Sequence, residues 1–99
     1  MLNMNKTVEN GSLIYTLTGR LDTVTAPELE RELRDELGSA GGLILDFAGL
    51  EYISSAGLRV LLAAQKAMAG QGELKILHVN EPIMEIFEVT GFSEILTIE

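Results

Sequence analysis

The residues of this sequence best placed for chemistry are two adjacent serines, Ser54 and Ser55. They follow an apolar stretch and stand at the predicted start of a helix over residues 55–69. The first turn of a helix leaves backbone amides unpaired and carries roughly half a positive charge. A phosphate attached to a serine there would meet hydrogen-bond donors and a favourable dipole. Serines at helix starts are also common N-caps, so a purely structural role is the alternative.

Catalytic and metal-binding interpretations have weaker support. The single histidine, His78, falls at the end of a predicted strand, and neither serine stands in a Gly-x-Ser-x-Gly elbow, so a serine hydrolase is not favoured. Asp46 ends an apolar run without a second ligand nearby, and we interpret it as an acceptor that organises a loop. Asp22 is by default a turn residue that bonds to its own backbone. We therefore predict no enzymatic activity, no metal and no cofactor.

Length and composition narrow the class of protein. The 99 residues are enough for one small domain over residues 1–99. Fifteen acidic and seven basic residues give a net charge of −8, which argues against binding to nucleic acid or to an anionic bilayer. Cysteine is absent, which excludes disulfides and thiol nucleophiles. Residues 56–69 are too short and too polar to span a bilayer and the amino end does not resemble a signal peptide, so we expect a cytoplasmic domain without membrane insertion.

Strand and helix signals alternate after an opening hairpin. Asn10-Gly11 predicts a type I′ turn between strands at about 4–9 and 13–18. Thr25 and Glu28 have the spacing of a capping box at the start of a helix that ends near Gly38. The apolar runs 43–47 and 74–79 predict buried strands, each followed by a helix, and residues 95–98 suggest a short last strand.

This order, β-β-α-β-α-β-α with a possible final β, predicts the fold class. Alternating strands and helices favour an α/β domain with a mixed sheet of four to five strands and helices packed mainly on one face. The strand at 43–47 is expected to end at Asp46-Phe47, and a short loop is expected to connect it to the two serines.

Four short motifs occur in a fixed order along nearly the whole chain: Gly19-Arg-Leu-Asp22, Leu43-Ile-Leu-Asp-Phe47, Tyr52-Ile-Ser-Ser-Ala-Gly-Leu58 and Thr90-Gly-Phe92. Together they resemble the STAS domains of bacterial anti-sigma factor antagonists. The resemblance implies the STAS fold and a switch protein rather than an enzyme. In that family the unphosphorylated form binds an anti-sigma factor that is also a serine kinase, and this binding frees the sigma factor. The kinase phosphorylates a serine, and a PP2C-type phosphatase removes the phosphate.

The resemblance assigns roles to individual residues. The phosphorylated serine stands two residues before the Gly-Leu pair, which places it at Ser55 and leaves Ser54 as the helix cap. Asp22 matches the acid of the family's Gly-x-Leu-Asp loop, which lies beside the acceptor helix and contributes to the partner surface. The residues expected to contact the partner are Asp22, Thr23, Ser54, Ala56, Gly57, Leu58, Arg59 and Leu62.

The chain departs from the family pattern at three of these motif positions. Ser54 replaces an acid that often precedes the acceptor, Ala56 replaces a hydroxyl residue, and Arg20 stands where an acid is frequent, which would alter the charge preference for a partner. The runner-up function is an accessory STAS subunit of a transporter or another assembly, in which the serine is not phosphorylated.

Charge gives a physical reason for the switch. A phosphate brings about −1.5 to −2 charges to Ser55, and burying it in an interface is costly unless a cation faces it. Ala56, Leu58 and Leu62 are candidates for a shallow apolar contact surface, unless the core takes them. Arg59, four residues after Ser55, is predicted to turn back to the phosphate within the chain.

Overall fold

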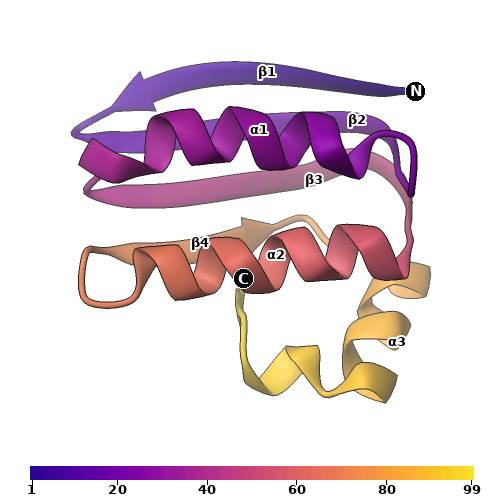
Figure 1. The fold of residues 1–99 in the computed structure, drawn as a ribbon. Helices are drawn as coiled ribbons and strands as arrows, with labels where there is room; N and C mark the ends of the chain where they lie inside the picture. The colour runs from indigo at the N-terminus through magenta and orange to yellow at the C-terminus, as the bar shows by residue number, and fades with distance from the viewer.

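The computed structural model describes residues 1–99, apart from the side chain of Ser39. The strands are β1 (Leu2–Glu9), β2 (Ser12–Leu21), β3 (Gly42–Ile53), β4 (Glu73–Leu77) and β5 (Thr97–Ile98). The helices are α1 (Ala26–Glu36), α2 (Ser55–Met68) and α3 (Glu81–Thr90), with 3₁₀ turns at Leu37–Ser39 and Phe92–Glu94. The strands form one sheet in chain order, in which β1 is antiparallel to β2 and the later neighbours are parallel (Figure 1). The predicted element order and mixed sheet are confirmed.

Helices α1 and α2 lie side by side on one face of the sheet, and α3 lies near the start of α2 (Figure 1). Alternate residues of β2 (Leu13, Tyr15 and Leu17) are buried in the same core as Leu29 and Leu33 of α1. A strand with one buried face and a helix with one apolar stripe produce this layer arrangement. None of the helices in the described residues is long and apolar enough to cross a membrane.

Tyr15 brings a polar group into this core. Its side chain is fully buried, and its hydroxyl donates a hydrogen bond of 3.0 Å to Oε2 of Glu32 on α1. Burial is the main cause that raises the pKa of the Tyr15 phenol, and the bond to Glu32 adds to it. The bond satisfies the buried hydroxyl of Tyr15.

Strand β3 is longer than the sequence predicts. The expected end at Asp46-Phe47 is wrong, because β3 continues to Ile53 and pairs with β2 along most of its length. Its pairing with β4 stops at Asp46, opposite Leu77. The register with β2 shifts between Thr16 and Thr18, where Asp46 Oδ1 accepts a hydrogen bond of 2.9 Å from the Ala48 N–H. This shift in register explains why the segment after Asp46 has the sequence of a loop. Asp46 organises the backbone there, as predicted.

The predicted turn of the first hairpin is confirmed, whereas the predicted capping box at the start of α1 is not. Asn10 and Gly11 both have positive φ, 52° and 82°, as a type I′ turn requires. The capping box at Thr25 is wrong, since the Thr25 side chain makes no cap hydrogen bond to the helix. Its hydroxyl donates to the Arg20 carbonyl at 2.8 Å and accepts from the Asp22 N–H at 2.9 Å. The Thr25 hydroxyl therefore closes the loop between β2 and α1 and does not cap the helix.

The parallel strands β2, β3 and β4 begin at one end of the sheet, the entry end, where three glycines lie close together. The Gly41 N–H donates to the Gly11 carbonyl at 3.0 Å. A Cβ atom on Gly72 would lie 2.1 Å from the Gly41 carbonyl oxygen, so only glycine fits there. Gln71 Nε2 donates to the carbonyls of Leu37 and Ala40, the latter at 2.9 Å. The entry end is thus closed by contacts within the chain.

Candidate functional site

The opposite end of the sheet, the exit end, is where β2 and β3 finish and the two serines stand. Ser54 has an extended backbone, and its N–H donates to the Leu21 carbonyl at 2.9 Å. Its Oγ accepts a hydrogen bond of 3.4 Å from the Gly57 N–H, which confirms that Ser54 caps α2. Because this bond is long, the cap is a weak one.

Ser55 is the first residue of α2 and its side chain is exposed. In the part of the chain that the structure describes, its hydroxyl makes no hydrogen bond, whereas Ser54 is used as the cap. The amides of the first helical turn have no intrahelical partners and stabilise negative charge. The Ser55 hydroxyl is therefore accessible, and the backbone around it favours an anion attached there.

Gly57 brings the first turn of α2 close to the ends of both strands. A Cβ atom at this position would lie 2.8 Å from Cγ1 of Ile53 and 2.8 Å from Cγ of Leu21. Both neighbours are buried core residues, as is Leu58. Leu58 is therefore part of the core and not of the expected apolar contact surface. Gly57 packs against the core beneath the two serines. Ala56 and Leu62 are half-buried and Arg59 is exposed.

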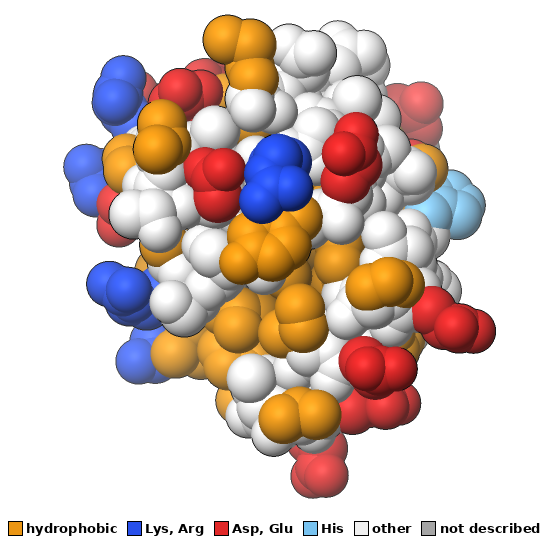
Figure 2. Space-filling view, turned by 90° about the vertical axis from the view of Figure 1, so that its right-hand side faces the viewer, with side chains coloured by type: hydrophobic (Ala, Val, Ile, Leu, Met, Phe, Trp, Pro, Cys, Tyr) orange, Lys and Arg blue, Asp and Glu red, His pale blue; other side chains and the backbone are white. Residues whose placement is uncertain are grey.

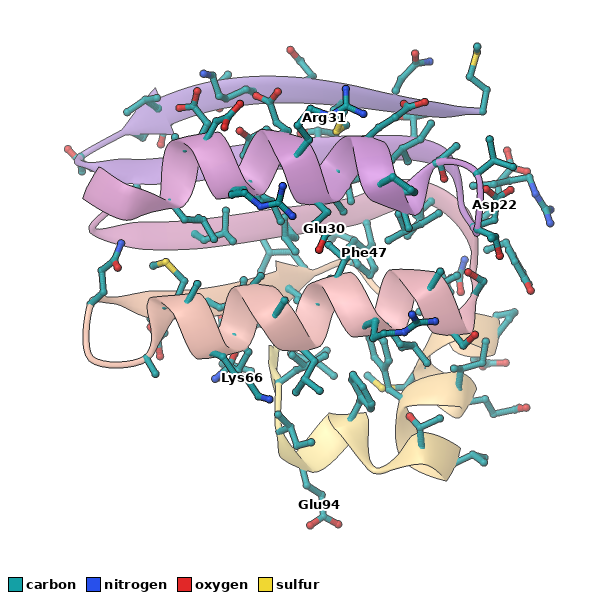
Figure 3. All side chains as sticks on the ribbon, viewed as in Figure 1. Asp22, Glu30, Arg31, Phe47, Lys66 and Glu94 are labelled. Atoms are coloured by element: carbon teal, nitrogen blue, oxygen red, sulfur yellow. The ribbon has the colours of Figure 1, made fainter. Side chains whose placement is uncertain are left out.

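The loop between β2 and α1 lies beside this helix start, where Figure 3 labels Asp22. Asp22 Oδ1 accepts hydrogen bonds from the Val24 N–H at 3.0 Å and the Thr25 N–H at 3.1 Å. The Thr25 backbone bond is the largest cause that lowers the pKa of the Asp22 carboxyl, with help from the Thr25 hydroxyl. These hydrogen bonds show Asp22 as the turn residue that bonds to its own backbone, as its sequence context predicts. Thr23, at the tip of the loop, is exposed.

A shallow groove of about 430 Å³ brings several of the expected site residues together. Thr23 and Pro27 line it from the side of α1, and Ala56 and Arg59 line it from α2. Glu30 points from α1 toward α2 across the same groove (Figure 3). The groove therefore joins the α1 loop to the residue after Ser55, and it gives a binding partner a concave surface beside the serine.

Two residues at the exit end were not among the expected partner contacts. The Arg20 guanidinium lies over the ring of Tyr52, 4.4 Å from its centroid. The sheet register pairs Arg20 with Tyr52 on adjacent parallel strands, so their side chains point the same way. Both stand in motifs of the sequence, but their contact depends on a register that local patterns do not contain.

Two other polar residues that the sequence analysis considered separately, Asp46 and His78, contact each other. His78 Nδ1 is 2.9 Å from Asp46 Oδ1 at the end of β4. Burial opposes the charge on Asp46, but the hydrogen bonds from His78 and the Ala48 N–H outweigh it and lower the pKa of this carboxyl. Within the described residues no group of three or more His, Cys, Asp or Glu side chains could hold a metal ion.

Comparison with known proteins identifies the family. Residues 3–99 match the STAS domain, and the chain therefore belongs to the STAS domain family. BtrV of Bordetella bronchiseptica, a candidate anti-sigma factor antagonist, is 38% identical over 91 residues, which cover 90% of this chain and 78% of BtrV.

Solved structures show the same fold. A crystal structure of an anti-sigma factor antagonist from Mycobacterium paratuberculosis superposes with a TM-score of 0.91 at 20% identity, over 99% of this chain and 85% of that one. The Bacillus protein SpoIIAA, at 17% identity, covers all of this chain, with TM-scores of 0.77 in its unphosphorylated form and 0.76 in its phosphorylated form. These matches cover 87% and 91% of the respective SpoIIAA chains.

Proposed function

We propose that this protein is a cytoplasmic anti-sigma factor antagonist that is controlled by phosphorylation of Ser55. The unphosphorylated chain binds an anti-sigma factor, which is also a serine kinase, and so releases the sigma factor. Phosphate on Ser55 ends this binding, and a PP2C-type phosphatase restores it. The observation that carries the proposal is the division of roles at the start of α2, where Ser54 caps the helix and the neighbouring Ser55 hydroxyl is exposed. The similarity to BtrV supports the class of protein.

Ser55 acts only as the acceptor in the proposed phosphoryl transfer. The bond between its Oγ and the γ-phosphorus of ATP forms as the bond from that phosphorus to ADP breaks, and the hydroxyl proton passes to a base of the kinase. The phosphatase reverses the modification with water, which returns the hydroxyl and releases inorganic phosphate. The exposure of Ser55 at the start of α2 lets the active site of another protein reach it.

The same geometry explains why phosphorylation should end binding without unfolding the domain. The phosphate extends into solvent and is stabilised by the positive end of the α2 dipole and by first-turn amides other than that of Gly57, which Ser54 caps, so the core is not disturbed. In a complex, the partner would have to desolvate this dianion beside the groove at Ala56 and Arg59. Phosphorylation is therefore expected to weaken the complex and to leave the stability of the domain unchanged.

A retention experiment with three forms of the chain tests the proposal. Wild type, Ser55→Ala and Ser55→Asp are immobilised and exposed to the anti-sigma factors of the source cell, with Ser54→Asp as the neighbouring-charge control. We expect wild type and Ser55→Ala to retain an anti-sigma factor and Ser55→Asp to lose at least 90% of it, an effect of about 1.4 kcal/mol or more. Incubation with the retained kinase and ATP should add one phosphate at Ser55, which mass spectrometry detects.

Equal retention by all forms would overturn the switch. Retention of a membrane transporter subunit in place of an anti-sigma factor, with no phosphate added to wild type, would favour the accessory-subunit alternative. Turnover of an ester that is lost in Ser55→Ala would indicate an enzyme.

A further inference from the structure

Arg20 and Tyr52 form an ordered cation–aromatic pair at the exit end, separate from the hydroxyl switch. The guanidinium lies 4.4 Å from the ring centroid, and Arg20 Nε lies 3.7 Å from Oδ2 of Asp22. The Arg20 side chain is 50% exposed and Tyr52 is 39% exposed, so both are available to another protein. Stacking on a ring and a neighbouring carboxylate limit the orientations of a guanidinium, which reduces the entropy lost when it binds.

The backbone fixes this pair to the same segment that positions the serines. Arg20 is paired with Tyr52, and the next residues, Leu21 and Ile53, are paired in turn. The Leu21 carbonyl then accepts the hydrogen bond from the Ser54 N–H at 2.9 Å. A partner that reaches Ser55 therefore meets Arg20 on the same end of the molecule.

Arg20 is a cation in an acidic region of an acidic protein. Exposed or half-exposed acids of the adjoining segments are Asp22, Glu51 and Glu81. Figure 2 faces this end and shows a basic side chain with acidic side chains on either side of it, above an apolar area, and further basic side chains along the left edge of the view. Among the described residues the guanidinium has one ion-pair partner, Asp22, and that contact is loose at 3.7 Å. Most of its N–H donors are therefore left for an incoming group.

We propose that Arg20, held on Tyr52, binds a carboxylate of the anti-sigma factor and selects for anti-sigma factors that carry an acid at that point. This inference rests on the proposed function and adds the chemistry of partner choice to it. A protein that docks on a chain of net charge −8 is expected to be mainly basic. Arg20 repels a basic group placed opposite it and can form two hydrogen bonds to a carboxylate. It therefore favours an anti-sigma factor with an acid at this point over one with a basic residue there.

Binding measurements on point variants test this proposal. The anti-sigma factor retained by wild type is titrated by calorimetry with Arg20→Glu, Tyr52→Leu and, as a control with the same change of charge, Lys66→Glu. Figure 3 places Lys66 on α2 away from the Asp22 loop. We expect Arg20→Glu to weaken binding about tenfold or more, Tyr52→Leu about threefold, and Lys66→Glu less than twofold. Reversing the opposing acid of the anti-sigma factor to Arg should restore binding to Arg20→Glu.

The outcomes separate this proposal from the switch. Ser55→Asp measured in parallel reports on the switch alone, because it leaves Arg20 and Tyr52 in place. Unchanged binding by Arg20→Glu, together with loss by Ser55→Asp, overturns the carboxylate contact and keeps the proposed function. Equal weakening by Arg20→Glu and Lys66→Glu also overturns it, because the effect is then one of overall charge. Failure of wild type to bind any anti-sigma factor overturns both. Circular dichroism of each variant confirms that it is folded.

Discussion

At the entry end of the sheet the chain contacts mainly itself, whereas at the exit end it leaves reactive and charged groups in solvent. Gly11, Gly41 and Gly72 let the turns of the entry end approach at backbone distance, and Gln71 joins them to the segment that follows α1, at Leu37 and Ala40. The exit end is also ordered by short contacts, but these lie below the surface. Its outer layer carries the Ser55 hydroxyl.

The difference shows how a small domain can divide stability from recognition. At the entry end, the Gly41 N–H and the Gln71 amide are used within the chain to hold the turns together. The exit end keeps Leu21, Ile53 and Gly57 as a rigid base, on which the exposed groups change charge or partner without moving the core. Substitutions at the two ends should therefore have different consequences, and the following predictions test that in order of decreasing effect.

Gly72→Ala should cause the largest loss of stability. Its Cβ would lie 2.1 Å from a backbone oxygen of Gly41, and backbone cannot move aside as a side chain can, so we expect a loss of about 2–3 kcal/mol in the free energy of unfolding. Urea denaturation measures it. Gly38→Ala is the matched control, because a Cβ there meets nothing within 4 Å. Folded Gly72→Ala should still bind the anti-sigma factor, and a selective loss of binding would contradict the division between the ends.

Gly57→Ala should have a smaller effect on stability and a distinct effect on binding. The new methyl would press on Leu21 and Ile53 at 2.8 Å, while the gain in helix propensity of about 1 kcal/mol offsets part of the cost. We expect a net loss of about 1 kcal/mol in the free energy of unfolding. Because the first turn of α2 must shift, affinity for the anti-sigma factor should fall about threefold or more. Unaltered affinity would show that the rigid base does not position the site.

Ser54→Ala and Ser55→Ala form a matched pair at adjacent positions. Ser54→Ala removes the cap of α2, and since that hydrogen bond is long at 3.4 Å, the loss should be at the low end of the usual range, about 0.5 kcal/mol. Ser55→Ala should change stability by less than about 0.3 kcal/mol, because its hydroxyl is exposed. Thermal unfolding of both variants measures the difference. A larger loss for Ser55→Ala would reverse the assigned roles.

The Asp22 loop should contribute a small pH dependence. The folded state lowers the pKa of Asp22 below its ordinary value of 3.8, so the unfolded chain binds more protons as the pH falls. The contribution is therefore fully present above pH 3.8 and is lost as the pH drops through the folded pKa. Unfolding at a series of acidic pH values should show a shallower slope for Asp22→Asn than for wild type. NMR titration of the Asp22 carboxyl supplies a direct check, and a folded pKa at the ordinary value would refute the argument.

Local patterns predicted the parts of the fold that depend on neighbouring residues. The Asn10-Gly11 turn, the Ser54 cap and the order of strands and helices follow from turn chemistry, capping and hydrophobic periodicity. Motif resemblance then located Ser55, whose exposure at the helix start fits the role that the motif implies, although its phosphorylation stays a prediction.

The features that the sequence did not predict depend on contacts between residues far apart in the chain. Thr25 has the sequence of a capping box, but its hydroxyl bonds to the Arg20 carbonyl in a loop closure that spacing alone does not predict. The second half of β3 contains Gly49 and Glu51, yet it is a strand because β2 continues beside it. The stack of Arg20 on Tyr52 depends on the same pairing, across 32 positions of sequence, and is visible only in the folded chain.

The contrast between Tyr15 and Tyr52 has an optical consequence. The chain has two tyrosines and no tryptophan, so its tyrosine fluorescence comes from these two rings. Tyr15 is sealed in the core and keeps its proton because burial and Glu32 raise its pKa. Tyr52 lies at the surface beneath Arg20. Changes in tyrosine fluorescence in the folded chain should therefore report events at the exit end, with Tyr15 as a constant internal reference and no label attached.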